Sequence, residues 1–477
     1  MLKFKEKVSY GIGRLGSSIT MDLADLFTGY VYYAFFGLGE NPFLAFLGVA
    51  IGKIVIAFSS YFSGYISDRT KTRWGRRKPY VILGAPLLAI AFFFLYSPHL
   101  ILPLIGLGNE TLEVFSYLIF FNSLYQGLYG FLLTPFQSWM PEITSTDERL
   151  EISGYQNTVN LIAFIIGAGS AFLLPGLLGG SADDLKKRLE TTNSIFTFLT
   201  NKEVLTIILP LIIGFFSFLV VIFFIPSLIE IKAREVFIPQ PNIREELKVV
   251  LGNKNYVSWT ITRGFISVAL SITMGIVLTW IDKALYFTGI IEYLLFGITL
   301  LGVVFSGFVL WGRFGNRQGK TNSYIYSGIW MAVWLPFTLV VGQIEIISQI
   351  LPVLLQAILF VIFAGIGVSG FYLLPYAIVA DIAEEDERRT GESRAGMYYG
   401  FESIPLNFFQ VIGYLIVGYL LQENFPFNIP TLPIFTDWQD HTYSLGLILW
   451  GPLAAIFILI SVVIFWKYVN ADPLKER

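Results

Sequence analysis

Long apolar stretches of about 20 residues or more alternate with short polar loops along most of this chain. Hydrophobic residues make up 55% of its 477 residues, and charged residues only 14%. A transmembrane helix needs about 20 apolar residues to cross the roughly 30 Å hydrocarbon core of a bilayer. The sequence therefore predicts a helical protein that crosses the membrane many times.

The lengths of the hydrophobic runs predict twelve spans. Six lie in the first half, at residues 17–37, 42–66, 80–100, 113–139, 153–178 and 204–228. Six lie in the second half, at residues 256–287, 290–311, 323–343, 346–380, 395–421 and 442–467. We therefore predict an all-α membrane protein with two six-helix halves, residues 1–230 and 255–477, joined by a cytoplasmic linker at 231–254.

Lys and Arg are concentrated in alternate loops, and this bias predicts the orientation of the chain. They cluster at the N-terminus, in the middle linker and after spans 2, 8 and 10, whereas the loops after spans 1, 3, 9 and 11 have none. The loop at 179–203 balances its basic residues with acidic ones, and we interpret it as an external cap. We expect both termini to be cytoplasmic, with no signal peptide before the first span.

Composition argues against several other classes of function. The chain has no Cys, so disulfides, thiol catalysis and thiolate metal sites are excluded. Its two His, His99 and His441, fall in predicted loops without a carboxylate pattern, so we expect no metal site. A net charge of −2 does not indicate a nucleic-acid partner. We find no motif of a membrane-embedded enzyme and no repeat typical of a channel filter, and we expect no cofactor.

The two halves contain similar short segments at corresponding positions, although chance similarity between apolar segments is an alternative explanation. Six plus six helices with parallel internal similarity predict the major facilitator architecture, which has its substrate site near the midplane between the halves. The matching positions are 63–65 with 306–308, 75–77 with 319–320, and Arg14 with Arg263.

Three segments at the ends of predicted spans carry a family resemblance. They are residues 64–79 (GYISDRTKTRWGRRKP), residues 135–144 (PFQSWMPEIT) followed by 147–149, and residues 380–396 (ADIAEEDERRTGESRAG). Together they resemble the glycoside–pentoside–hexuronide:cation symporters, the melibiose permease family, and the related sucrose–proton symporters. The resemblance implies a major facilitator fold and cation-coupled transport of a sugar.

Charged residues within these segments are predicted to control gating. At cytoplasmic helix ends they can form ion pairs with neighbouring helices and so favour one state of the gate. Alternatively, they only hold their loops on the cytoplasmic side. The gating candidates are Asp68, Arg69, Arg73, Arg76, Arg77, Glu142, Arg149, Asp381 and Arg394.

The chain departs from the family at positions that matter for coupling and sugar binding. The departures concern the acidic residues of spans 1, 2 and 4 in sodium-using members, the arginine of span 5 and the lysine of span 11. The corresponding residues here are Ser18, Ile56, Ser60, Leu133, Asn157 and either Asn407 or Phe408. The resemblance therefore supports neither the usual sodium site nor a particular sugar.

A different set of intramembrane charges remains. Asp22 and Asp25 share one helical face of span 1 with Ser18, and Lys53 lies at a similar depth on span 2. Such charges are costly in a membrane unless they are paired, so we expect an Asp22/Asp25–Lys53 network. Two carboxylates that share one ammonium cannot both be ionised at low cost, so one can bind and release a proton. A static ion pair and direct substrate binding are the alternatives, and Glu402 is a second coupling candidate.

Polar side chains and aromatic rings on several spans could bind a sugar, because hydroxyl groups need hydrogen-bond partners and sugar faces stack on rings. Tyr129 is the leading candidate because it matches a family position just before Pro135. The candidates are Ser18, Asn122, Tyr125, Gln126, Tyr129, Asn157, Asn160, Trp280, Tyr376 and Asn407.

The sequence thus predicts a secondary active transporter of the cell membrane that moves a glycoside or oligosaccharide by alternating access. A proton is favoured over sodium as the coupling ion, and a monomer is expected to be the functional unit. The alternatives are a transporter of an amphiphile such as a lysolipid, and a sodium-coupled or uncoupled sugar carrier.

Overall fold

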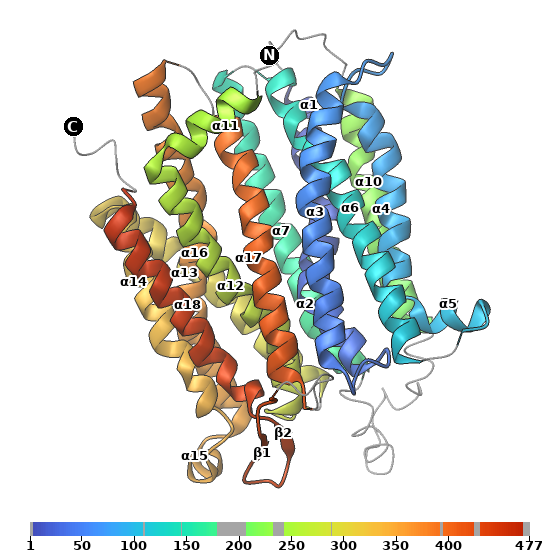
Figure 1. Ribbon diagram of the computed structural model, residues 1–477, viewed down its shortest axis with the longest axis vertical. Coiled ribbons are helices and arrows are strands. Elements are labelled where there is room, and N and C mark those ends of the chain that lie inside the picture. Colours follow the sequence, from blue (N-terminus) through green and yellow to red (C-terminus); the bar gives the residue numbers. More distant parts are fainter. Residues whose placement is uncertain are drawn as a thin grey trace. The chain divides into compact units, whose positions relative to one another are not determined.

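The computed structural model describes residues 3–107, 110–144, 146–178, 207–231, 243–287, 289–391, 395–423 and 430–470. Long helices make up most of this part of the chain (Figure 1). Contacts divide the chain into two compact units: Met1–Ile238 with Thr288–Tyr293, and Pro239–Phe287 with Leu294–Arg477.

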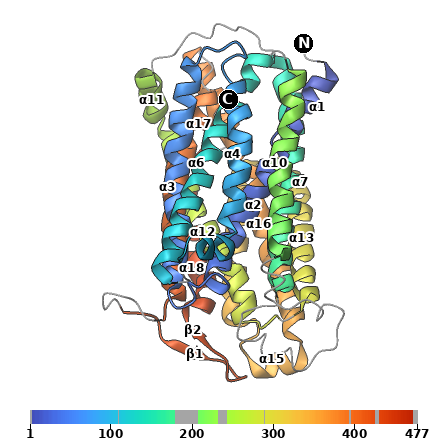
Figure 2. The ribbon, with the colours of Figure 1, turned by 90° about the vertical axis from the view of Figure 1, so that its right-hand side faces the viewer.

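The first unit is built from helices that run alongside one another. Helix α3 packs along α6, α4 lies against both α6 and α10, and α2 lies against α7 (Figure 2). The elements are α1 (Phe4–Ile12), α2 (Leu15–Ala34), α3 (Pro42–Arg69), α4 (Lys78–Leu95), α5 (Pro98–Leu104), α6 (Thr111–Ile143), α7 (Thr146–Leu178) and α10 (Leu209–Glu230).

The second unit is also helical, with one small hairpin. Helix α12 packs against α17 and α18, and α14 packs against α16 and α18. The elements are α11 (Ile243–Gly252), α12 (Lys254–Lys283), α13 (Ile290–Gln318), α14 (Lys320–Trp334), the 3-10 helix η3 (Leu335–Leu339), α15 (Glu345–Ile350), α16 (Val353–Thr390), α17 (Ala395–Leu421), β1 (Ile434–Thr436), β2 (Thr442–Ser444) and α18 (Gly446–Tyr468).

Each of the twelve predicted spans corresponds to a long helix of the structure. Within the described residues, nine helices are long and apolar enough to cross a membrane: α3, α4, α7, α10, α12, α13, α16, α17 and α18. The predicted spans at 17–37, 113–139 and 323–343 correspond to α2, α6 and α14.

Proline explains several differences between the predicted and observed helix ends. The span predicted at 80–100 is interrupted, because α4 ends at Leu95 and Pro98 starts the separate helix α5. The span predicted at 323–343 changes to a 3-10 helix after Trp334, where Pro336 lacks the backbone N–H that a continuing helix requires. Helix α16 starts after Pro352 rather than at residue 346, and it runs to Thr390 rather than 380.

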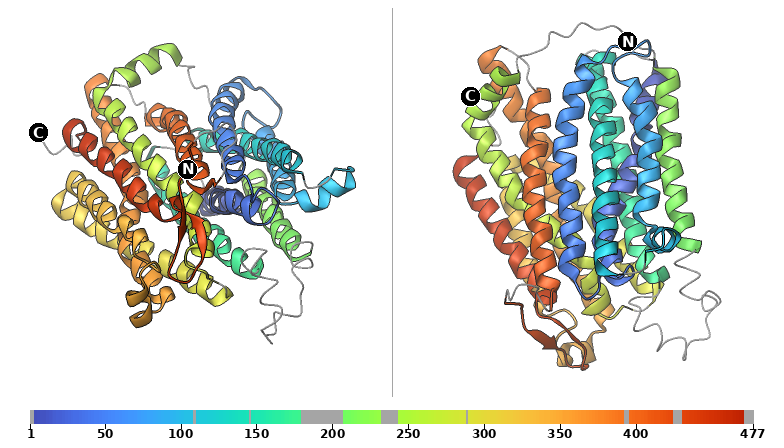
Figure 3. Two further views of the ribbon diagram at one scale, coloured as in Figure 1. Left: turned by 60° about the horizontal axis from the view of Figure 1, so that its bottom comes forward. Right: turned by 45° about the vertical axis from the view of Figure 1, so that its right-hand side comes forward.

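A hairpin replaces the start of the last predicted span. Residues 442–444 form β2, which pairs antiparallel with β1 in the register Phe435↔Tyr443, so α18 begins only at Gly446. The hairpin lies at the end of the second unit where α18 begins (Figure 3). Its Asp437 carboxylate accepts hydrogen bonds from the backbone N–H groups of Gln439 and His441, and its Oδ2 lies 3.0 Å from His441 Nδ1. His441 thus has a carboxylate partner that its sequence context did not suggest, and His99 lies in α5 rather than in a loop.

Candidate functional site

An ion pair joins α2 and α3 inside the first unit. Lys53 Nζ lies 2.5 Å from Asp25 Oδ1, and the side chains of these residues are 2% and 24% exposed. The two residues are 28 positions apart and meet because α3 returns alongside α2. The pairing expected between these two spans is therefore present, and it uses Asp25.

Asp22 lies one turn before Asp25 and faces α7 at Gly167. A Cβ atom at Gly167 would lie 2.5 Å from the carbonyl oxygen of Ile19 and 2.9 Å from Asp22 Cβ, so only glycine allows α7 to approach this closely. The Asp22 carboxylate interacts electrostatically with Asp25, Arg14 and Lys53. The helix faces thus bring two carboxylates and two cations into one region of the first unit.

Arg14 connects several predicted site residues to this region. Its Nε donates to Ser18 Oγ at 3.3 Å, and the Ser18 hydroxyl donates to Asn160 Oδ1 at 3.3 Å. The Arg14 side chain also lies close enough to the Tyr129 hydroxyl to interact with it electrostatically. Arg14 is not among the residues that the sequence assigns to the site, although its position four residues before Ser18 places both on one helical face. We refer to Arg14, Ser18, Asp22, Asp25, Lys53, Tyr129 and Asn160 as the N-terminal polar cluster.

Three further sugar-binding candidates lie on α6 and are buried within the first unit. Asn122 Nδ2 donates to the carbonyl oxygen of Gly48 at 2.9 Å, and the Tyr125 hydroxyl donates to Thr20 Oγ1 at 3.1 Å. These bonds connect α6 to α3 and to α2, so both side chains hold helices together. Gln126 differs, because its buried Oε1 has no hydrogen-bond partner among the described residues. Contact of these three side chains with a substrate remains a prediction.

A second group of buried polar side chains lies in the second unit, between α12 and α17. Glu402 Oε1 accepts a hydrogen bond from Trp259 Nε1 at 3.0 Å and lies 3.4 Å from Arg263 Nε. The Trp259 ring is buried against Tyr324 and Phe465. We call Trp259, Arg263 and Glu402 the C-terminal polar cluster. Of the three, only Glu402 is among the predicted site residues; the signal for Arg263 is its correspondence with Arg14.

The other predicted sugar-binding residues of the second unit make local contacts. Trp280 is fully buried, with its ring 5.4 Å from Phe360 and 5.7 Å from Trp450 between centroids. The Trp280 ring therefore packs within the second unit, and its contact with a sugar remains a prediction. Asn407 Nδ2 donates to the carbonyl oxygen of Ser403 within α17.

Three gating candidates form a buried ion-pair cluster in the first unit. Arg76 Nη2 and Arg77 Nε both donate to Glu142 Oε1, at 2.9 and 2.8 Å. Arg77 also donates to Ser67 Oγ. The cluster thereby joins the end of α3, the start of α4 and the end of α6. Burial of Arg77 and Glu142, which are 5% and 6% exposed, makes loss of either partner costly.

The second unit has a corresponding ion pair. Lys320 Nζ, at the start of α14, lies 2.5 Å from Asp381 Oδ2 near the end of α16. The preceding Gly319 has a φ of 91°, and Gly75, before Arg76 and Arg77, has a φ of 92°. Both units thus contain a glycine with a positive φ. In each, the glycine is followed by a cation that pairs with a carboxylate of the next long helix. This geometry gives the sequence similarity between 75–77 and 319–320 a structural basis.

The remaining gating candidates have a local environment or are not described. The Arg69 guanidinium lies over the Tyr65 ring at 3.4 Å, and that of Arg73 lies over the Trp74 ring at 4.9 Å. Neither pairs with a carboxylate among the described side chains. The side chains of Asp68, Arg149, Asn157, Tyr376 and Arg394 lie outside the described residues, as does the loop at 179–203. No group of three metal-ligating His, Cys, Asp or Glu side chains occurs in the described part of the chain.

Comparison with known proteins gives matches along almost the whole chain. The model of the family described as "MFS/sugar transport protein" matches residues 9–469. An uncharacterized symporter of Synechocystis sp. is 24% identical, over 98% of this chain and 95% of that protein. The glucuronide carrier protein homolog of Escherichia coli is 22% identical, over 99% of this chain and 93% of that protein. The sodium-dependent lysophosphatidylcholine symporter 1 of Mus musculus is 25% identical, over 72% of this chain and 64% of that protein.

The fold is also that of solved transporters. A crystal structure of a bacterial homolog of the human lysosomal transporter Spinster superposes with a TM-score of 0.62 at 12% identity, over 99% of this chain and 98% of that one. The fold is therefore that of the major facilitator superfamily, and the resemblance to the glycoside–pentoside–hexuronide:cation symporters is confirmed. The matched proteins are transporters rather than enzymes, so this chain is a multi-pass membrane transporter of the symporter type.

Proposed function

This chain belongs to the MFS/sugar transport protein family, and we propose that it carries a glycoside or oligosaccharide across the cell membrane by alternating access, driven by protons. Its functional unit in this proposal is a monomer with both termini in the cytoplasm. The orientation follows from the basic residues at the N-terminus and in the loop after α3, together with the absence of Lys and Arg from the loops after spans 1, 3, 9 and 11.

The sugar assignment is supported by the family match and by the side chains of the N-terminal polar cluster. The relative that matches along almost the whole chain at 22% identity is named for glucuronide, a sugar acid conjugate. Tyr129 is only half-buried and Asn160 is partly exposed, so both have surface left for a ligand. A phenol ring and an amide provide the stacking and hydrogen bonds that sugar recognition requires.

Proton coupling is carried by one observation: Lys53 neutralises Asp25, while Asp22 one turn away remains a second carboxylate in the same region. Protonation of Asp22 would remove one negative charge from this part of the bundle. A change of conformation that takes the carboxylates further from water favours the protonated form, because burial penalises the charged form. Exchange of one proton per cycle would couple the two access states to the proton gradient.

The positions that carry acidic residues in sodium-using relatives support a proton rather than sodium. Ile56 and Leu133 are buried apolar side chains, 7% and 4% exposed, and neither can supply a sodium ligand from its side chain. Ser60 has only a hydroxyl group. The two carboxylates of α2, Asp22 and Asp25, belong to a cluster that already contains Arg14 and Lys53.

The test is uptake into proteoliposomes with imposed gradients. Candidate substrates are first selected by thermal stabilisation of purified protein with mono-, di- and trisaccharides and glycosides, because a ligand of the folded state raises its apparent stability. Accumulation of the selected sugar is then measured with a pH gradient alone and a sodium gradient alone. We expect accumulation with the pH gradient only. Accumulation that depends on the sodium gradient and not on the pH gradient would refute proton coupling.

Transport of a lysolipid is the second candidate, because one relative at 25% identity is a lysophosphatidylcholine symporter. The same stabilisation panel therefore includes lysophosphatidylcholine and lysophosphatidylglycerol. Stabilisation and uptake of a lysolipid, with no response to any sugar, would replace the sugar assignment.

A further inference from the structure

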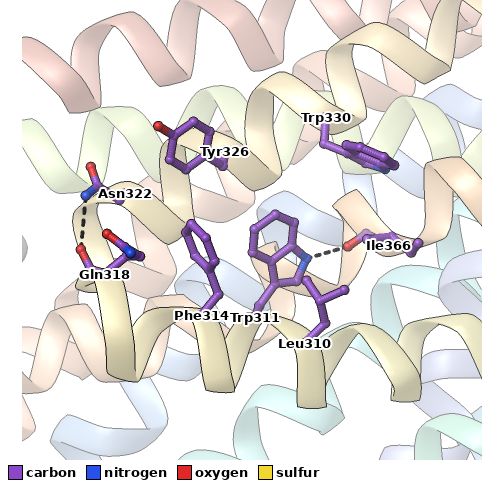
Figure 4. A pocket seen from close by; sticks show the side chains of 8 residues that line it. All are labelled: Leu310, Trp311, Phe314, Gln318, Asn322, Tyr326, Trp330 and Ile366. Atoms are coloured by element: carbon purple, nitrogen blue, oxygen red, sulfur yellow. Dashed lines mark hydrogen bonds between the residues drawn. The ribbon is translucent and has the colours of Figure 1, made fainter.

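A groove opens on the surface of the second unit between α13 and α14, with a volume of about 570 Å³. Leu310, Trp311 and Phe314 of α13 line one wall, and Tyr326 and Trp330 of α14 line the other (Figure 4). Leu310, Tyr326 and Trp330 are exposed large side chains. Helix α13 is long and apolar enough to cross a membrane, and most of its central residues are not buried within the protein. Exposed apolar side chains on such a helix face hydrocarbon.

The apolar part of the groove offers rings without free hydrogen-bond donors. Trp311 Nε1 donates to the carbonyl oxygen of Ile366 at 2.7 Å, and Trp330 Nε1 donates to that of Phe363 at 2.8 Å. The indole N–H groups are thus used within the protein, and the ring surfaces face the groove. This surface suits an acyl chain and offers a sugar no donor from either indole.

One end of the groove is polar, and two exposed cations of α13 lie near it in the sequence. Gln318 and Asn322 line this end, where Asn322 Nδ2 donates to the carbonyl oxygen of Gln318 (Figure 4). Arg313 and Arg317 do not line the groove themselves; they follow Leu310 at spacings of three and seven residues, which places them on the side of α13 that borders it. Both arginines are exposed, and neither pairs with a carboxylate among the described residues. By contrast, the nearby Lys320 is paired with Asp381.

We propose that this groove binds one anionic phospholipid of the surrounding membrane, with an acyl chain along the aromatic walls and its phosphate at Gln318, Asn322 and the two arginines. Aromatic side chains at membrane depth contact lipid in general, so they do not specify a headgroup. The guanidinium groups of Arg313 and Arg317 specify an anionic headgroup, because basic pockets between transmembrane helices attract such headgroups. The lipid joins α13 to α14 and stabilises the second unit; it is a resident ligand and is distinct from the transported substrate.

The experiment compares two lipids with identical acyl chains on the purified, delipidated full-length protein. Phosphatidylglycerol and phosphatidylcholine are added in detergent, and the apparent melting temperature is measured, with glycerol phosphate as a probe that lacks acyl chains. We expect phosphatidylglycerol to raise the melting temperature more than phosphatidylcholine, and glycerol phosphate to have no effect. Native mass spectrometry of the unmodified protein should show one retained phosphatidylglycerol.

Three variants locate the effect. In the double variant Arg313→Gln/Arg317→Gln, the response to phosphatidylglycerol should fall to that of phosphatidylcholine. Leu310→Trp fills the groove and should remove both responses. Lys467→Gln is the matched control, because Lys467 is an exposed cation in the last turn of α18 that does not line the groove. Equal responses to the two lipids, or a phosphatidylglycerol preference that survives the double arginine variant, would overturn the proposal.

Discussion

Lys53 and Asp25 form an ion pair in which the ammonium is enclosed and the carboxylate remains partly accessible, with 2.5 Å between Nζ and Oδ1. The accessible partner can exchange with water, whereas the cation is held in place by α3. Asp22 lies on the same face of α2, so protonation of either carboxylate changes the charge balance around a cation that cannot leave.

Replacement of Asp22 by Asn should separate coupling from substrate movement. If Asp22 carries the transported proton, Asp22→Asn will exchange substrate across the membrane at equal concentrations but will not accumulate it with a pH gradient. Counterflow and gradient-driven uptake in proteoliposomes measure the two activities. Glu345→Gln, an exposed residue of α15, is the matched control and should retain both. Uphill uptake by Asp22→Asn at the normal rate would assign the proton to another group.

Removal of Lys53 alone should be more harmful than removal of the whole pair. Lys53→Met leaves the Asp25 carboxylate without its cation, at a cost on the order of 3 kcal/mol for a fully buried pair and less here because Asp25 is partly exposed. Lys53→Met/Asp25→Asn removes both charges and should recover most of the lost stability. The melting temperatures of both variants in detergent give this comparison, and equal losses would mean that the ion pair contributes little.

The Arg76/Arg77–Glu142 cluster should hold the ends of α3, α4 and α6 together. Glu142→Gln leaves two guanidinium groups without their shared carboxylate, so the helix ends should separate more often. The chain contains no Cys, so an introduced Ser18→Cys is its sole thiol, and its labelling rate with a maleimide reports access to the interior. We expect faster labelling in the Glu142→Gln background. Glu384→Gln, which breaks the exposed pair with Arg388, should leave the rate unchanged.

Gly167 should tolerate no side chain. A Cβ atom there would be 2.5 Å from the Ile19 carbonyl oxygen, so Gly167→Ala must push α7 away from α2, at a typical cost of about 1–3 kcal/mol. Gly214→Ala on α10 is the matched control, because its Cβ would be 3.7 Å from the nearest atom of Phe93, an ordinary contact. Alanine also favours a helix over glycine by up to about 1 kcal/mol, so the control should be neutral or stabilising. Similar melting temperatures for both variants would contradict the close approach of α2 and α7.

The bond between Trp259 and Glu402 should stabilise the second unit independently of the charge on Glu402. Trp259→Phe keeps most of the ring packing but removes the donor, at a typical cost of about 0.5–1.5 kcal/mol for a hydrogen bond. Glu402→Gln keeps an oxygen acceptor for the indole and removes the ion pair with Arg263. If the melting temperature falls in Trp259→Phe and uphill transport is lost in Glu402→Gln, the structural and coupling roles belong to different partners.

The sequence by itself determined the helical membrane architecture, because a span depends on the local length of an apolar run. It also determined that intramembrane charges need partners, which brought Asp25 and Lys53 together from their depths in adjacent spans. The prolines at 98, 336 and 352 indicate helix ends in the sequence, which the length of the hydrophobic runs alone did not predict.

Only the tertiary structure decided which distant residues meet. Arg77 pairs with Glu142 across 65 positions, Lys320 with Asp381 across 61, and Trp259 with Glu402 across 143. It also enclosed Trp280 among aromatic rings and used Asn122 and Tyr125 to join helices. These contacts depend on how each helix is rotated and spaced against its neighbours. The apolar surface of a helix in lipid does not fix that rotation or that spacing. Close packing at glycines and a few long-range polar contacts select one arrangement among many with the same spans.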